Sequence, residues 1–283
     1  MAVIEWKLYE TGHCRHPELA TWKGGSLRSC EFPALVALLR HPRQGWVLFD
    51  TGYSDHFLQA TATFPERLYR LVTPVSSMPC QSLVMQLRRD GIEPDDVGWV
   101  VLSHLHGDHV GGLADFPRAR VACSLEAWQD LQARSRFSAL RRGLLPALLA
   151  HADGSTWQWF EELPARQLEV PFDCFPNVRD LFADGSLLLV PLPGHAPGHY
   201  GALFHDARGP VFLVADASWS SAAIRDNAPP PGWVTDWLGS TPVYRQTLTR
   251  LHDLQHSAAA VRIVPSHCRE WRPVGRGPWR TAY

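Results

Sequence analysis

The segment VVLSHLHGDHVGG, residues 100–112, places three histidines and one aspartate within six consecutive positions. They are His104, His106, Asp108 and His109, and an apolar run precedes them directly. Histidines clustered in this way either bind a metal ion or lie in a solvated loop without function. Neutral imidazole nitrogen and carboxylate oxygen are both good zinc ligands, so the segment is a candidate metal site.

The spacing of these residues predicts two neighbouring groups of ligands. In an extended chain alternate residues share a face, so His104 and His106 should point the same way at the end of a strand. Gly107 then allows the chain to turn, which would bring Asp108 and His109 beside the first pair. The motif therefore offers what a site for two metal ions requires.

Three other segments place a candidate ligand at the end of an apolar run. They are PLPGHAPGH with His195, FLVADAS with Asp216, and IVPSHC with His267. Each precedes a turn, which is where an α/β fold gathers its chemistry. His199, four residues beyond His195, is either a hydrogen-bond partner of a ligand or a structural histidine.

The elements that position these residues are predicted from hydrophobic periodicity. Residues 32–52 indicate two strands around a turn, and residues 97–106 and 259–267 indicate strands that run into the candidate ligands. The stretch QSLVMQLRRDG predicts a helix with Leu83, Val84 and Leu87 on one face and Gly91 at the C′ position.

A further helix is predicted before the last strand, with Thr241 as N-cap and Pro242 at the first helical position. Its inward stripe is expected to consist of Val243, Thr247, Leu251 and Leu254.

Two apolar segments have alternative interpretations. Residues 137–152 are apolar and interrupted by Pro146, which favours a packed helix pair over a lid or an acyl-chain wall. Trp219, Trp233 and Trp237 cluster between two motif segments, and wide apolar rings near a site can form a substrate wall.

The composition bounds the function class. The chain has 283 residues, of which 45% are hydrophobic and 19% charged, as in globular proteins with a large core. A net charge of -1 without a long basic run argues against nucleic-acid partners. No signal-peptide pattern and no apolar stretch of roughly 20 residues is found, so we expect no membrane span. Six cysteines without a C-x-x-C pair indicate reduced thiols and a cytoplasmic location.

The motif segments, in this order, resemble the metallo-β-lactamase-fold hydrolases. The matching segments are LFDTG at 48–52, HLHGDH at 104–109, PGHAPGH at 193–199, ADAS at 215–218 and PSH at 265–267. The resemblance spans nearly the whole chain. It implies an α/β fold, a four-layer αββα sandwich of two mixed β-sheets flanked by helices. It also implies one domain over residues 1–283, with variable insertions at about 53–79 and 128–175.

The same resemblance implies two Zn²⁺ per chain, with iron or manganese as alternatives. The implied ligands are His104, His106 and His195 for one metal, Asp108, His109 and His267 for the other, and Asp216 as a bridge between them. Two divalent ions lower the pKa of a bridging water and give hydroxide near neutral pH. Asp108 would orient this nucleophile or carry a proton to the leaving group.

Within the superfamily the layout most resembles the N-acyl homoserine lactonase branch. True β-lactamases usually have a cysteine at the bridging position, so Asp216 argues against antibiotic cleavage. A tyrosine commonly stands three residues later in the lactonases, where it is thought to hydrogen-bond the lactone carbonyl. Here that residue is Trp219, which either donates its indole N–H to substrate or forms a hydrophobic wall. The predicted activity is hydrolysis of an ester or lactone with an apolar part.

Other activities of the same fold are alternatives. A thioester hydrolase of the glyoxalase II type usually has a basic C-terminal glutathione-binding segment, for which the stretch after His267 is too short. A mononuclear iron sulfur dioxygenase would contain one iron instead of two zinc ions. RNA processing disagrees with the balanced charge. A non-catalytic, metal-containing signalling protein and a homodimeric assembly are both left open.

Overall fold

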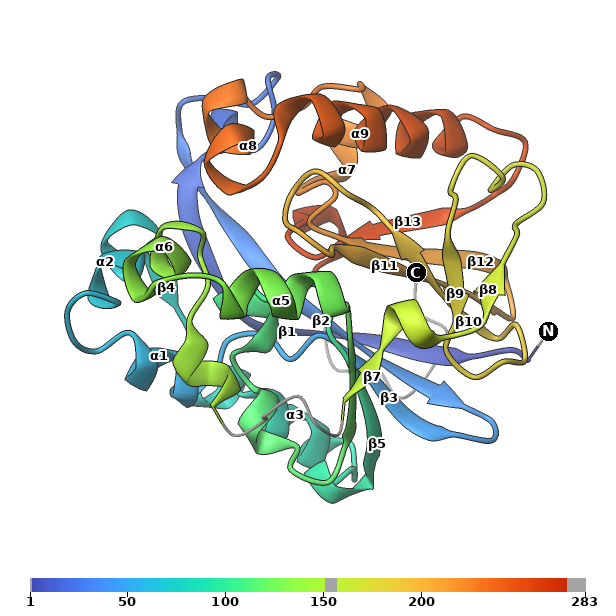
Figure 1. Ribbon diagram of the computed structural model, residues 1–283, viewed down its shortest axis with the longest axis horizontal. Coiled ribbons are helices and arrows are strands. Elements are labelled where there is room, and N and C mark those ends of the chain that lie inside the picture. The colour runs from blue at the N-terminus through green and yellow to red at the C-terminus, as the bar shows by residue number, and fades with distance from the viewer. Residues whose placement is uncertain (1, 151–156, 274–283) are drawn as a thin grey trace.

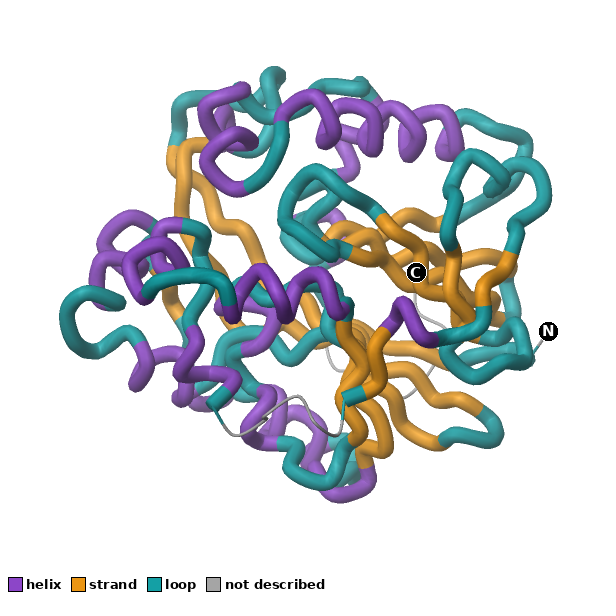
Figure 2. The backbone as a smooth tube through the Cα atoms, in the orientation of Figure 1, coloured by secondary structure: helices purple, strands orange, loops and turns teal. Residues whose placement is uncertain are grey.

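The computed structural model describes residues 2–150 and 157–273. In this part of the chain two β-sheets pack face to face and helices cover their outer sides (Figures 1 and 2). The predicted α/β class with two mixed sheets is confirmed. A single domain over residues 1–283 with two insertions stays a prediction, and residues 151–156 of the second insertion lie outside the described residues. Among the described helices, none is long and apolar enough to cross a membrane.

The first sheet combines antiparallel and parallel strands. Its order is β4 (Val75–Ser76), β1 (Glu5–Pro17), β2 (Ser29–His41), β3 (Gly45–Phe49), β5 (Val97–Val101), β6 (Arg120–Cys123) and β7 (Gln158–Trp159). The strands β4, β1, β2 and β3 pair antiparallel, whereas β3, β5, β6 and β7 pair parallel. The carboxyl ends of β3, β5 and β6 therefore meet at one edge of this sheet.

The second sheet is antiparallel except at one edge. Its order is β13 (Arg262–Pro265), β12 (Gly209–Ala215), β11 (Tyr200–Asp206), β10 (Leu187–Pro191), β9 (Val178–Asp180) and β8 (Ala165–Arg166). Only β12 and β13 pair in parallel. Their carboxyl ends consequently lie side by side, and each is followed within two residues by a predicted ligand.

The alternation of side chains along the strands explains the four layers. In and just after β5, Val100 and Leu102 pack toward the helices of the first sheet, whereas Val101 packs between the two sheets. In β12, Phe212 packs toward the helices of the second sheet and Leu213 between the sheets. Apolar residues on both faces of a strand require cover on both sides, which the opposite sheet and the outer helices supply.

The helices are short except the last. They are α1 (Asp55–Ala60), α2 (Arg67–Val72), α3 (Leu83–Arg89), α4 (Gly107–Val110), α5 (Leu125–Gln132), α6 (Arg136–Arg141), α7 (Ser221–Arg225), α8 (Gly232–Leu238) and α9 (Thr241–Gln255). The 3₁₀ helices are η1 (Glu18–Ala20), η2 (Pro79–Gln81), η3 (Pro94–Asp96), η4 (Leu113–Asp115), η5 (Pro146–Leu149), η6 (Phe160–Glu162) and η7 (Arg269–Trp271). Figure 1 shows α9 running across the second sheet, on the side away from the first.

The predicted helix at 81–91 is confirmed as α3. Leu83 and Leu87 are buried against the first sheet, and Val84 is half-buried beside them. Gly91 follows the C-cap with φ at +78°, the left-handed conformation expected at C′.

The predicted start of α9 is wrong by one residue. The N-cap is Ser240, and Thr241 is already helical. Instead of capping, the Thr241 hydroxyl donates to the Gly232 carbonyl at 3.1 Å, and the Thr241 N–H donates to Asp236 Oδ1 at 3.1 Å. A side chain from α8 thus satisfies the first N–H of α9. The inward stripe also differs, because Tyr244 and Leu248 are buried and Val243 is only half-buried.

Candidate metal centre

The motif at 100–112 folds as its spacing predicts. The chain stays extended after β5, and α4 begins at Gly107 with His106 as its N-cap. A Cβ at Gly107 would lie 2.9 Å from Leu145 Cδ1 and 3.0 Å from a Phe57 ring carbon, so the turn has little room for a side chain. Asp108 and His109 then lie in the first turn of α4, where the ring of His109 lies 4.1 Å from the ring of His104.

Three histidines form a buried group of nitrogens. His106 Nδ1 lies 3.0 Å from His104 Nε2 and 3.0 Å from His195 Nε2. The histidines are at most 5% exposed. Four-coordinate zinc, with Zn–N of about 2.0–2.1 Å, sets neighbouring ligand atoms about 3.3 Å apart, close to the spacing of these nitrogens.

The charge state of this group suits a cation. Burial lowers the pKa of His106 to about 4 and lowers the pKa of His104 and His195 well below the usual value. The three imidazoles are therefore neutral at physiological pH, and each has a nitrogen lone pair that can bind a metal.

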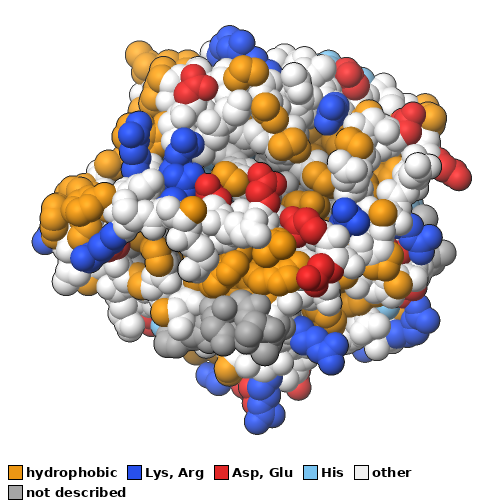
Figure 3. Space-filling view, viewed as in Figure 1, with side chains coloured by type: hydrophobic (Ala, Val, Ile, Leu, Met, Phe, Trp, Pro, Cys, Tyr) orange, Lys and Arg blue, Asp and Glu red, His pale blue; other side chains and the backbone are white. Residues whose placement is uncertain are grey.

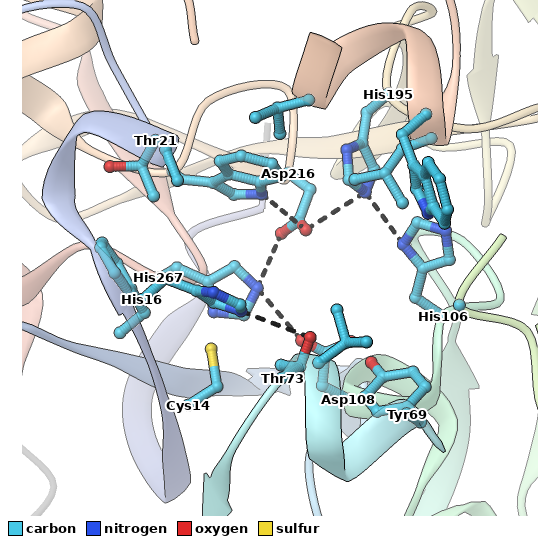
Figure 4. Close-up of a pocket in the computed structure, with 18 of the residues that line it drawn as sticks. Cys14, His16, Thr21, Tyr69, Thr73, His106, Asp108, His195, Asp216 and His267 are labelled. Carbon is cyan, nitrogen blue, oxygen red and sulfur yellow. Dashed lines mark hydrogen bonds and ion pairs between the residues drawn. The ribbon is translucent and has the colours of Figure 1, made fainter. Parts of the chain in front are cut away.

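A second group lies next to the first. His267 Nε2 is 3.3 Å from Asp108 Oδ2 (Figure 4). His109 Nε2 is 3.9 Å from Asp108 Oδ1. The two histidines are buried and come from different sheets, His109 after β5 and His267 after β13. The sequence-predicted ligands thus fall into two groups of three, as the resemblance implied.

Asp216 lies between the two groups. Its Oδ2 faces the first group, 3.3 Å from His195 Nε2. Its Oδ1 faces the second, 3.3 Å from His109 Nε2 and 3.2 Å from His267 Nε2. Both His109 Nε2 and Asp216 Oδ1 are buried and have no hydrogen-bond partner among the described residues. Two orphaned polar atoms that face each other are expected where a metal ion is to be bound.

The second group carries an excess of negative charge. Burial alone would lower the pKa of His109, but the carboxylates of Asp216, Asp50 and Asp108 outweigh it and raise this pKa to about 10. Burial likewise opposes ionisation of Asp108, but His109 and His267 lower its pKa to about 2. The carboxylates give this group a negative charge that a divalent cation would balance. The residues therefore fit a metal pair.

Asp50 is a site residue that the sequence did not reveal. It follows β3, and its Oδ2 accepts a hydrogen bond from His109 Nδ1 at 2.7 Å. Ser103 holds the same carboxylate through its backbone N–H and its hydroxyl, each at 2.8 Å. The segment LFDTG contained the signal, because Asp50 directly follows an apolar strand. We read that segment only as a fold marker.

His199 and Trp219 both hold Asp216. The backbone N–H of Asp216 donates to His199 Nε2 at 3.1 Å, and burial lowers the pKa of His199 to about 3, so this nitrogen is free to accept. The Trp219 indole N–H donates to Asp216 Oδ2 at 2.9 Å. The indole ring also packs edge-on against the His195 ring, 5.6 Å away. Trp219 therefore contacts the ligand group itself.

A cavity of about 760 Å³ opens over the metal centre (Figure 4). Its wall is mostly apolar and comes from η1, α2, α6, α8 and the loop after β12. The ligands that reach it are His106, Asp108, His195, Asp216 and His267. Trp219, Trp233 and Trp237 all line it, and their contact with substrate stays a prediction.

Residues 137–150, the described part of the segment at 137–152, both pack in the core and line this cavity. Ala139 of α6 is buried in the core, whereas Phe137 and Leu140 face the cavity. The favoured interpretation as packing helices alone was thus incomplete. Exposed apolar side chains also gather over α2 and α6, among them Leu71 and Phe137 (Figure 3).

Comparisons with known proteins agree with this geometry. The family model of the metallo-beta-lactamase superfamily matches residues 31–267. The N-acyl homoserine lactonase AttM of Azorhizobium caulinodans is 28% identical over 244 residues, which cover 84% of this chain and 82% of that protein.

Solved structures show the same fold. One is an N-acyl homoserine lactone hydrolase with the product N-hexanoyl-L-homoserine bound at its catalytic metal centre. It has a TM-score of 0.71 at 20% identity, with 95% of each chain covered. Another is AidC, a dizinc quorum-quenching lactonase, with a TM-score of 0.63 at 17% identity, covering 95% of this chain and 89% of that one.

Proposed function

The chain belongs to the metallo-beta-lactamase superfamily and is a metal-dependent hydrolase, and on that premise we propose that it is a dizinc enzyme that opens a lactone or ester with an apolar acyl part. The observation that carries the proposal is the carboxylate of Asp216. Each of its oxygens lies within 3.3 Å of a different histidine group. A carboxylate placed in this way suits a bridge between two ions.

The seven side chains that hold the ions would be His104, His106, Asp108, His109, His195, Asp216 and His267. Two zinc ions bound there would lower the pKa of a water between them and polarise the substrate carbonyl. The chain itself supplies the proton relay and the substrate wall.

Asp108 is the proposed proton carrier. Its carboxylate reaches the cavity as well as the second histidine group. It can accept a proton from the attacking water and deliver it to the alkoxide that leaves, so that water and ester become acid and alcohol. Asp108 lies beside His267 at the cavity and is only partly buried, so its carboxylate can exchange a proton with a bound substrate.

The cavity supports an apolar acyl substrate. About 760 Å³ lined by aromatic and aliphatic side chains is enough room for an acyl chain of several carbons or an aromatic group. Related proteins were solved with N-hexanoyl- and N-decanoyl-L-homoserine bound, which are products with apolar chains. We propose acyl homoserine lactones and similar acylated lactones as the first substrates to test.

The test is turnover of a lactone and ester panel by zinc-loaded protein, with metal content measured in parallel. We expect two zinc ions per chain and lactone opening. Asp108→Asn should lower kcat by about 10²–10⁴, the usual contribution of a positioned acid–base group. Wild-type protein that opens no lactone or ester, or that binds one iron and no second ion, would contradict the proposal.

A further inference from the structure

Trp219, the residue that the sequence offered as a possible donor to substrate, has no free donor in this structure. It stands three residues after Asp216 and lines the cavity. An indole has a single N–H, and here it donates to Asp216 Oδ2 at 2.9 Å. Trp219 can therefore stabilise the ligand but has nothing left to donate to a substrate carbonyl.

Tyr69 on α2 offers a hydroxyl from another wall of the same cavity. It is half-buried, and Figure 4 shows its ring beside Asp108. Across the described residues, its hydroxyl has no hydrogen-bond partner. Neighbouring hydroxyls on the wall are already bonded: Thr73 Oγ1 lies 3.3 Å from His16 Nε2, and the Thr21 hydroxyl donates to the Glu18 carbonyl at 2.8 Å.

The position of the Tyr69 ring is fixed by packing. The ring meets Phe57 edge to face, with centroids 5.3 Å apart and planes at 80°. Phe57 is fully buried and packs in turn on Tyr53, 4.8 Å away. The residue before α2 is also tied down, because Glu66 accepts two hydrogen bonds from Arg136 of α6, at 2.6 and 2.7 Å. A phenol held in this way is a pre-organised donor, which is the kind that stabilises charge developing in a transition state.

We propose that Tyr69 is a catalytic residue that donates a hydrogen bond to the carbonyl oxygen of the lactone or ester being cleaved. The inference rests on the proposed hydrolytic function. When the nucleophile adds to the carbonyl carbon, the π electron pair moves onto this oxygen, and the Tyr69 O–H stabilises the resulting charge without giving up its proton. The pair then returns to reform the carbonyl, and the bond to the alkoxide breaks. The phenol has a normal pKa of about 10 in water and therefore enters the reaction protonated.

Arg141 is the rival donor. It also lines the cavity, but its guanidinium lies over the Trp237 ring, 4.9 Å from the centroid. Tyr69 is favoured because its ring lies beside Asp108 on the cavity wall (Figure 4), whereas Arg141 lies against α8 at the tryptophan wall.

The test is Tyr69→Phe in the zinc-loaded enzyme, assayed on the substrates that wild type opens. The ring and its contact with Phe57 remain, so metal content and melting temperature should not change. We expect kcat to fall by about 10²-fold, as when one oxyanion donor is removed, with little change in KM. The matched control is Tyr244→Phe, which removes a buried hydroxyl that does not line the cavity and has no partner in the described part of the chain. This control should retain wild-type kcat.

Three outcomes would overturn the assignment. One is a kcat of Tyr69→Phe within about twofold of wild type. The second is a loss of kcat that is matched by Tyr244→Phe or accompanied by loss of metal, which would indicate a structural role. The third is a large loss of kcat in Arg141→Met with Tyr69→Phe unaffected. If the wild-type enzyme opens no lactone or ester, the proposed function fails and this inference fails with it. If the wild-type enzyme is active and one of the three outcomes above is observed, only the role of Tyr69 is contradicted.

Discussion

At the scale of single residues, the candidate metal ligands are held in place by side chains from other parts of the chain, as Asp50 holds His109. His195, Asp216 and His267 could be predicted because each follows an apolar run at a strand end, a local pattern. Asp50 follows the same pattern, but its task is to accept a hydrogen bond from His109 across 59 positions of sequence. Contacts of that kind depend on how strands align in the sheet, which residue types alone do not reveal. The indole N–H of Trp219 donates to Asp216, only three positions away, but the direction of the ring depends on the path of the loop after β12, which residue types alone do not reveal.

Asp50→Asn should weaken metal binding without creating a cavity in the core. An amide oxygen is a weaker acceptor than a carboxylate, so His109 loses its charge-assisted partner and its fixed orientation. We expect zinc affinity to fall by about 10–100-fold, measured by competition with a chelator.

The control for this variant is Asp115→Asn, which changes another aspartate–histidine pair, Asp115 with His56 at 2.9 Å, outside the cavity wall. Zinc affinity that drops equally in both variants would contradict a specific role for Asp50.

At the scale of elements, strand positions were predicted well and helix details less well. Strands such as β5 and β12 are continuous apolar runs that must be covered on both faces, and such runs can be recognised in the local sequence. The start of α9 was missed because its first N–H is satisfied by Asp236 of the preceding helix. For α6 the sequence favoured packing over a cavity wall, whereas this short helix uses one side for packing and another for the cavity.

The loop that carries His195 depends on Gly194. This glycine has φ at +125°, and a Cβ there would lie 2.4 Å from the backbone of Tyr244 in α9. Gly194→Ala should therefore lower the free energy of unfolding by about 1–2 kcal/mol from the backbone conformation plus about 1–3 kcal/mol from the clash. It should also reduce bound zinc, because His195 shifts with the loop.

The matched control is Gly185→Ala. Gly185 has φ at +76° but open space around its Cβ position, so only the conformational cost applies. Urea unfolding of the two variants compares the costs directly, and equal losses of stability would show that α9 does not restrict the loop.

On the scale of the whole molecule, each sheet supplies part of the metal centre, and a second polar link joins the sheets elsewhere. Asp206 at the end of β11 accepts a hydrogen bond from the Trp6 indole of β1 at 2.9 Å. It also accepts two from the Arg262 guanidinium of β13, one of them at 2.7 Å. The apolar interior between the sheets could be predicted from the alternation of side chains along the strands. This link could not, because its three residues are spread over more than 250 positions of sequence.

The stability of this link should depend on pH. Burial of the Asp206 carboxyl opposes ionisation, but the hydrogen bonds from Arg262, Trp6 and the Arg208 N–H outweigh it and lower its pKa to about 2. The unfolded chain has an aspartate pKa of about 3.9. The folded-state pKa is the lower one, so the stabilisation is fully present above about pH 4 and is lost as the pH falls toward about 2.

Asp206→Asn should lower the free energy of unfolding at neutral pH by about 3 kcal/mol, the lower end of the cost of breaking a buried ion pair. The difference in the free energy of unfolding between variant and wild type should become smaller as the pH falls from about 4 to about 2. Denaturant titrations at several pH values measure it, with Asp226→Asn at an exposed aspartate as the control. A gap that stays constant across this range would contradict the electrostatic origin of the link.

The metal ligands follow strands of the two sheets, whereas much of the cavity wall comes from the short helices α2, α6 and α8. This separation has a consequence for how the protein can evolve. Apart from Tyr69, substitutions of cavity-wall residues in the short helices should change which molecules enter while leaving the strand ends where they are. The range of substrates can therefore change by single substitutions that do not touch the residues that hold the metal ions.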